Sequence, residues 1–250
     1  MKIPTVLTIA GSDNMGGAGI QADIVTIAQV GCQPTNVITA VTAQNSRGVQ
    51  AVFPLPTDII AAQIDSVMSE CLPSVIKIGM VYNADIVNCI TDTLERYPKL
   101  PIIFDPVMVS TSGGSLLTPD TIDVITKRLF PICTLITPNI PEAAVLLNEP
   151  PATAISIVDT SLRLAQRYKC NVLLKGGHLS GNVLSDVLTC VDSDTTEVFS
   201  STRIEGTNFH GTGCRLSSGI AAFLAKGFPL SESIRQSKSL LEQHYRDINR

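Results

Sequence analysis

Tryptophan is absent from the chain and aromatic residues make up only 4% of it, so a platform for stacking nucleic-acid bases is not expected. Charged residues are also scarce, at 16%, and the formal net charge is -4 with no basic cluster, which argues against general nucleic-acid binding. No apolar run approaches the length of a membrane span. We therefore expect a protein that binds neither nucleic acid nor membrane.

The cysteine pattern excludes two further classes of protein. The chain has seven cysteines, an odd number, with no Cys-x-x-Cys pair, and most lie within apolar patterns. We therefore expect no disulfide framework and no zinc site, but a reduced cytoplasmic protein with buried thiols. The apolar start, Met1–Ala10, is short for a signal peptide and is better explained as a first strand followed by the loop Gly11-Ser12-Asp13.

Apolar residues, at 44% of 250, can form a large core. Short runs rich in β-branched residues alternate with helical patterns, which predicts one α/β domain over residues 1–250 with a mainly parallel sheet. The expected strands are Thr5–Ala10, Val37–Thr42, Val75–Gly79, Ile102–Asp105, Thr134–Thr137, Asn171–Leu174, Leu184–Val191 and Glu197–Ser200. The expected helices are Ile20–Val30, Thr57–Cys71 with Thr57 as its cap, Asn83–Tyr97, one opening at Thr118-Pro119, Ser156–Tyr168, Gly213–Lys226 and Ser231–Tyr245. Val49–Leu55 is predicted to be a short edge or lid strand outside the main sheet, and such an edge predicts a homodimer.

The segment His210–Gly219 predicts an anion site. Gly211, Thr212 and Gly213 form a Gly-x-Gly turn that leads into an apolar helical pattern. Such a turn directs several backbone N–H groups, together with the positive end of the helix dipole, toward one point. The alternative is a tight turn before a surface helix, and Cys214 in the first helical turn favours the functional interpretation.

Three further places carry polar side chains at the ends of predicted strands, where ligands bind in open α/β sheets. Lys175 leaves a strand into two glycines and could meet phosphate oxygens, and Asp105 suits a metal or a magnesium–phosphate complex. Gln44 can read the edge of a heteroaromatic ring, or belong to an ordinary polar turn.

Two carboxylates have both a structural and a functional interpretation. Asn139 and Glu142 can share one face of a helix start as ligands, or they can simply cap that helix. Asp23 lies in the first turn of a helix, where a carboxylate complements the helix dipole without binding anything.

Seven segments follow one another along the chain: TIAGSDNMGGAGIQAD (8–23), VTAQNS (41–46), KIGM (77–80), DPVMV (105–109), TPNIPE (137–142), LKGGH (174–178) and HGTGC (210–214). In order and spacing they resemble the hydroxymethylpyrimidine/phosphomethylpyrimidine kinases of thiamin biosynthesis, in the ribokinase-like superfamily. The resemblance covers nearly the whole chain and implies a three-layer αβα sandwich with a mainly parallel central sheet and a small lid or edge strand. Arg215 stands where the family often has threonine.

The resemblance also implies an activity and roles for the residues. ATP would phosphorylate the hydroxymethyl group of 4-amino-5-hydroxymethyl-2-methylpyrimidine, with its monophosphate as a further candidate acceptor. The amides of Gly211–Cys214 would hold the transferring phosphoryl group, and Lys175 would meet the ATP phosphates. Mg²⁺ would be ordered by Asn139 and Glu142, with Asp105 nearby. The pyrimidine would lie among Gly11, Asp23, Gln44, Met80 and Val107.

Cys214 stands where most ribokinase-like enzymes have an aspartate base. A helix start lowers the pKa of a thiol, whereas bound phosphates would raise it. Cys214 is therefore either the base or a small group that closes the pocket. Two other functions stay open: a pyridoxal/pyridoxine kinase, and a ligand-binding protein that has lost turnover.

Overall fold

The structure is a computed structural model that describes residues 3–108, 117–153, 156–177, 183–193, 195–202 and 211–248. The predicted loop at Ser110–Ser115 and the histidines at 178 and 210 lie outside these ranges. All seven cysteines lie within them and are free thiols, but only Cys32 and Cys170 are buried, whereas the other five are partly exposed. No helix in the described ranges is both long enough and apolar enough to cross a membrane.

One nine-stranded sheet runs through the described residues in the order β3-β2-β1-β4-β5-β6-β7-β8-β9. Its strands are β1 (Thr5–Asp13), β2 (Gln33–Asn45), β3 (Gly48–Pro54), β4 (Val75–Ile78), β5 (Ile102–Phe104), β6 (Leu135–Ile136), β7 (Asn171–Leu174), β8 (Val183–Cys190) and β9 (Thr195–Thr202). Neighbouring strands from β2 to β7 pair in parallel, whereas β3, β8 and β9 join antiparallel. The predicted mainly parallel sheet is confirmed.

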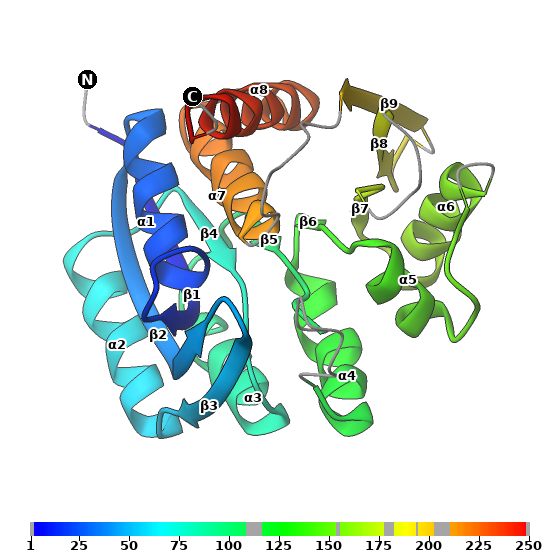
Figure 1. Ribbon diagram of the computed structural model, residues 1–250. Coiled ribbons are helices and arrows are strands. Elements are labelled where there is room, and N and C mark those ends of the chain that lie inside the picture. Colours follow the sequence, from blue (N-terminus) through cyan, green and yellow to red (C-terminus); the bar gives the residue numbers. More distant parts are fainter. Residues whose placement is uncertain are drawn as a thin grey trace.

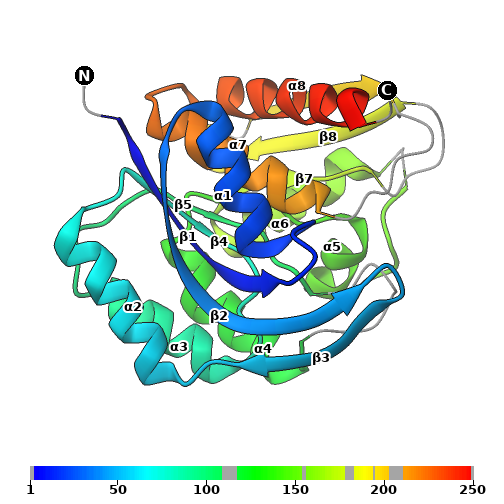
Figure 2. The ribbon, with the colours of Figure 1, turned by 60° about the vertical axis from the view of Figure 1, so that its left-hand side comes forward.

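Helices cover both faces of this sheet. They are α1 (Gly19–Val30), α2 (Thr57–Glu70), α3 (Ala84–Leu94), α4 (Pro119–Val124), α5 (Ile140–Leu147), α6 (Ile157–Tyr168), α7 (Thr212–Ala225) and α8 (Leu230–Ile248). Helix α4 continues through a π-helical turn (Ile125–Leu129) and a 3-10 turn (Phe130–Ile132). Helices α1, α7 and α8 pack side by side on one face (Figures 1 and 2).

Alternation along the strands divides the core between the two faces. In β1, Val6 packs with the apolar side chains of α1, α7 and α8, whereas its neighbour Leu7 packs with the cluster that includes α2 and α3. In β4, Val75 likewise packs with the cluster that includes α1, α7 and α8, and Ile76 packs with the cluster that includes α2 and α3. The three-layer αβα arrangement implied by the resemblance is therefore confirmed.

The helix boundaries follow local signals. Gly31 follows α1 in the left-handed conformation at φ 88°, directly after the predicted helix end at Val30. Asn83 caps α3 and Thr118 caps α4, so both helices begin within one residue of the predicted start. The predicted Thr57 cap is wrong, because Pro56 occupies the cap position of α2 and no side chain caps it.

Two strand predictions also need correction. Gly11-Ser12-Asp13 was expected to be a loop, but these residues extend β1, since Ser12 and Asp13 pair with Val41 and Thr42 of β2 across a register shift. Strand β3 was expected to lie outside the main sheet, but it pairs with β2 and forms the sheet's edge (Figure 2).

Candidate active site

The predicted site residues line up along one edge of the sheet. Parallel strands bring their carboxyl ends to the same edge, where an open α/β sheet binds ligands. From β2 to β7 that edge carries, in spatial order, Gln44, Gly11, Met80, Asp105 with Val107, Asn139 with Glu142, and Lys175. Residues separated by up to 164 positions in the sequence, Gly11 and Lys175, therefore form one row.

A buried ion pair lies toward the β7 end of this row. Lys175 Nζ is 2.6 Å from Asp105 Oδ1, and Thr137 Oγ1 donates to the same oxygen at 3.0 Å. Burial alone would raise the pKa of Asp105, but Lys175 and Lys77 outweigh it and the pKa is lowered. Burial likewise opposes the charge on Lys175, yet Asp105 and Glu142 hold its pKa above the ordinary value. Both groups are therefore charged at neutral pH.

Glu142 and Asn139 form the capping box that was the structural alternative. Asn139 Oδ1 accepts from Glu142 N at 2.9 Å, and Glu142 Oε2 accepts from Asn139 N at 2.8 Å. Burial raises the pKa of Glu142 to about 7, although Lys175 pulls it down. The cap does not exclude a second role, since this buried carboxylate also faces the Lys175–Asp105 pair.

The start of α7 lies directly over that ion pair. A Cβ placed on Gly213 would be 3.1 Å from Asp105 Oδ2 and 3.2 Å from Lys175 Nζ. Gly211 is the N-cap, at φ 81°, and a Cβ there would come within 1.9 Å of the carbonyl oxygen of Gly17. Gly211 therefore has to be glycine, and at Gly213 a side chain would crowd the ion pair. The first turn of α7 is thereby held against the loop after β1 with its backbone close to Lys175.

The thiol of Cys214 belongs to the same helical turn. Desolvation by the surrounding protein raises its pKa to about 11, although Lys77 and the backbone N–H of Gly19 lower it. Desolvation therefore outweighs the lowering of the thiol pKa that was expected at a helix start, and the thiol is protonated at neutral pH. This favours the pocket-shaping role of Cys214 over that of a ready base.

Asp23 is not positioned to touch a ligand directly. It is 0% exposed, and Oδ2 accepts from Thr8 Oγ1 at 2.6 Å and from Lys77 Nζ at 2.7 Å. Oδ1 accepts from Ser218 Oγ at 2.6 Å. Both oxygens are occupied beneath the site, so the expected contact between Asp23 and the ring is not available in this structure.

The opposite end of the row carries the residues expected to hold the ring. Gly11 is buried, and a Cβ there would lie 2.6 Å from Met80 Cε, so these two residues are in direct contact. Thr39 Oγ1 donates to the Met80 carbonyl at 2.7 Å. Gln44 and Val107 are partly buried at the ends of β2 and β5. The structure thus brings Gly11 and Met80 together and places Gln44 and Val107 on the same edge.

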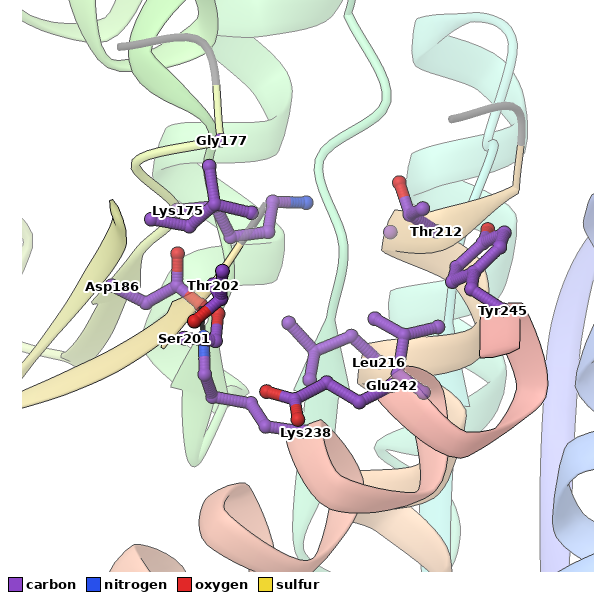
Figure 3. A pocket seen from close by; sticks show the side chains of 13 residues that line it. Lys175, Gly177, Asp186, Ser201, Thr202, Thr212, Leu216, Lys238, Glu242 and Tyr245 are labelled. Carbon is purple, nitrogen blue, oxygen red and sulfur yellow. Dashed lines mark hydrogen bonds and ion pairs between the residues drawn. The ribbon is translucent and has the colours of Figure 1, made fainter. Parts of the chain in front are cut away.

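A cavity of about 140 Å³ opens beside Lys175 (Figure 3). Its walls come from the β7–β8 connection, β8, β9, α7 and α8 (Lys175, Gly177, Leu184, Asp186, Ser201, Thr202, Thr212, Gly213, Leu216, Lys238, Leu241, Glu242 and Tyr245). Lys238 forms an ion pair with Asp186, whose Oδ1 accepts from Gly176 N at 2.9 Å. The sequence predicted both helices but did not mark Asp186, Lys238 or Tyr245 as site residues, because an amphipathic pattern does not show which polar residue turns inward.

Carboxylates alone do not make a metal site here. Within the described ranges, no group of three or more His, Cys, Asp and Glu side chains could hold a metal ion. Asp105 and Glu142 supply two buried carboxylates on neighbouring strand ends, and Mg²⁺ commonly takes one or two carboxylates with phosphates and water. A helix start over a charged lysine, two carboxylates and an adjoining cavity is the arrangement expected of a phosphoryl-transfer enzyme.

Comparison with known proteins gives the family. Residues 13–249 match the phosphomethylpyrimidine kinase family. A hydroxymethylpyrimidine/phosphomethylpyrimidine kinase from Rhizobium meliloti is 43% identical over 94% of this chain and 88% of its own length. The chain belongs to the phosphomethylpyrimidine kinase family. A bifunctional protein of thiamine biosynthesis from Geobacter sulfurreducens is 42% identical, and this chain spans 47% of its length.

Solved structures agree with this assignment. A phosphomethylpyrimidine kinase from Clostridium difficile 630 superposes with a TM-score of 0.84 at 38% identity, covering 98% of this chain and 100% of that one. The ADP complex of a Bacillus subtilis pyridoxal kinase gives a TM-score of 0.85 at 30% identity, covering 95% of this chain and 90% of that one. Two ring specificities therefore occur on this fold.

Proposed function

We propose that this protein transfers the γ-phosphoryl group of ATP to the hydroxymethyl group of 4-amino-5-hydroxymethyl-2-methylpyrimidine. The observation that carries the proposal, beside family membership, is the position of Gly213 over the Lys175–Asp105 pair. Backbone donors at a helix start and a fixed ammonium group there face one point. Both stabilise the charge that develops on a transferring phosphoryl group.

In the reaction, the hydroxymethyl oxygen bonds to the γ-phosphorus as the bond to the β–γ bridging oxygen breaks, which yields the phosphate ester and ADP. The amides of Gly211–Cys214 hold the equatorial oxygens, and Lys175 neutralises charge on the phosphates. In a loose transition state the hydroxyl proton leaves late, to a phosphate oxygen or to solvent, so a preformed thiolate at Cys214 is not required. The pKa of Cys214, raised by desolvation to about 11, means that the group is a thiol at neutral pH and not a preformed thiolate.

Mg²⁺ fits the residues at the β5 and β6 strand ends. Glu142 is buried with a pKa of about 7, which indicates a carboxylate that lacks full compensation and would gain from a divalent cation. Asp105 and Glu142 would hold the ion, with Asn139 ordering its water, and the ion would neutralise phosphate charge. Thr137 and the capping box orient the two carboxylates.

The ring end uses different residues. Gly11, Met80 and Val107 form the apolar and backbone walls, and Gln44 reads the ring's polar edge. Asp23 lies beneath these residues, where it accepts hydrogen bonds from Thr8, Lys77 and Ser218, and it does not contact the ring. The monophosphate product is a further candidate acceptor at the same site.

The test is ADP release from the purified protein with ATP, Mg²⁺ and one ring compound at a time. The hydroxymethylpyrimidine should support turnover, and pyridoxal at equal concentration should support less. The pyridoxal kinase alternative rests on the structural similarity to such enzymes. Faster turnover with pyridoxal would establish it, and no ADP release with either ring would favour a binding protein.

We also propose a homodimer formed through the β2–β3 edge. Phe53 is 67% exposed and pairs in register with Val41, which is 46% exposed, so apolar side chains are displayed along the ribbon. Light scattering should give twice the chain mass, and Phe53→Asp should give the monomer mass. A wild-type monomer would contradict this assignment. The cytoplasmic location stays a prediction from the cysteine content.

A further inference from the structure

One tyrosine in the cavity beside Lys175 has a buried hydroxyl without a partner. Tyr245, near the end of α8, is only 8% exposed, and no hydrogen bond to its hydroxyl is found in the described part of the chain. Two other tyrosines are satisfied: Tyr97 donates to Asp65 and Tyr168 to the Leu146 carbonyl, each at 2.7 Å. A buried hydroxyl without a partner is unusual because its desolvation is not compensated.

The position of Tyr245 indicates what would satisfy it. Figure 3 shows the ring beside Thr212, at the start of α7, across the cavity from Lys175 and Asp186. The lining also contains side-chain acceptors, among them Ser201, Thr202 and Glu242, but within the described part of the chain none of them is bonded to the hydroxyl. The hydroxyl is therefore close to the backbone donors of the anion site, on the opposite wall from the lysine.

The hydroxyl at this place is a donor. Burial raises the pKa of Tyr245, while the nearby positive charge of Arg215 lowers it only in part, so the phenol keeps its proton at neutral pH. The charge of Arg215 acts on Tyr245, and Lys175 lies across the cavity. The two carboxylates of the lining, Asp186 and Glu242, are paired with Lys238 and Arg246, so the remaining cations favour a negatively charged acceptor. The nucleotide of the proposed reaction carries such acceptors on its phosphates.

We propose that the Tyr245 hydroxyl donates a hydrogen bond to a phosphate oxygen of the nucleotide bound in this cavity. Tyr245 is then a nucleotide-binding residue whose free hydroxyl is completed by the ligand. This inference rests on the proposed function for the presence of a nucleotide, but not on the identity of the ring.

The test compares Tyr245→Phe, which removes one oxygen, with Tyr168→Phe as the matched control. Calorimetry with ADP alone should show about tenfold weaker binding for Tyr245→Phe, since a hydrogen bond to a charged acceptor is lost. Tyr168→Phe, which removes a satisfied hydroxyl far from the cavity, should bind ADP as the wild type does. Adenosine, which lacks phosphates, should bind equally to Tyr245→Phe and the wild type.

Thermal unfolding separates this role from a structural one. Without nucleotide, Tyr245→Phe should melt at or above the wild-type temperature, whereas the shift caused by ADP should shrink. Wild-type ADP affinity in Tyr245→Phe, or an equal loss with adenosine, would overturn the phosphate assignment. If the wild type itself fails to bind ADP, the proposed kinase function fails instead.

Discussion

Gly213→Ala is the most direct perturbation of the anion site. The added methyl group would lie 3.1 Å from Asp105 Oδ2 and 3.2 Å from Lys175 Nζ, and both distances are closer than ordinary van der Waals contact. Lys175 and Asp105 are joined at 2.6 Å, so they must shift together or separate. The methyl group also occupies space directly in front of the proposed phosphoryl position.

The expected magnitudes differ for activity and stability. Gly213 lies within α7 without a positive φ, so alanine suits its backbone and would favour the helix by up to about 1 kcal/mol, which offsets the local crowding. The unfolding free energy should therefore stay within about 1 kcal/mol of wild type. The turnover number should fall by up to about 100-fold, because Lys175 and Asp105 must shift by a few tenths of an ångström and the methyl group crowds the proposed phosphoryl position.

Gly219→Ala is the matched control in the same helix. Its added Cβ would lie 2.9 Å from Ser237 Oγ and 3.1 Å from Ser237 Cβ, at the contact between α7 and α8. It should lower the unfolding free energy by about 1–3 kcal/mol while the folded protein keeps its turnover number. ADP release and urea unfolding measure the two effects. If Gly213→Ala retained wild-type turnover, or lost it only in proportion to unfolding, the placement of the anion site would be wrong.

Three further changes test other parts of the row. Lys175→Gln should lower turnover at least about 100-fold. Because Asp105 loses its partner, urea unfolding should also show an unfolding free energy lower by about 3 kcal/mol. Unchanged turnover would show that Lys175 takes no part in the reaction. Gln44→Ala should weaken ring binding about tenfold by calorimetry and leave ADP affinity unchanged, and equal ring affinity would exclude Gln44. The pKa of Glu142 is raised to about 7, so the folded protein keeps a proton that the unfolded chain releases near pH 4.5. The unfolding free energy should therefore fall as pH rises from 4.5 to 7, by at most about 3 kcal/mol. Glu142→Gln should flatten this pH dependence, and an identical slope would contradict it.

The sequence predicted best what depends on local chemistry. The left-handed stop at Gly31 and the capping pair Asn139–Glu142 were both visible as short patterns, and both are present. The parallel strands and their polar carboxyl ends followed from the alternation of β-branched runs with helical patterns. Since parallel strands must end at one edge, the approximate site followed as well.

Long-range partners could not be predicted in this way. The residues around Asp23 favoured a helix-dipole role and the resemblance implied a ring contact; neither showed the buried network, because Lys77 and Ser218 stand 54 and 195 positions away. Tyr245 was the last residue of the final predicted helix, and nothing local marks its hydroxyl as unsatisfied. Gly11 was expected to begin a loop, but pairing with β2 continues the strand past it.

The buried pair Lys77–Asp23 explains how the start of α7 keeps its place over the sheet. Both side chains are 0% exposed, and a buried ion pair adds little net stability because desolvation offsets the attraction. Its geometry nevertheless joins α1 to β4 through Lys77, to β1 through Thr8 and to α7 through Ser218. Ser218 lies one and a half turns beyond Gly213, so a change in this network would move the anion site relative to Lys175. Accuracy of position, more than stability, is what the buried charges contribute to this fold.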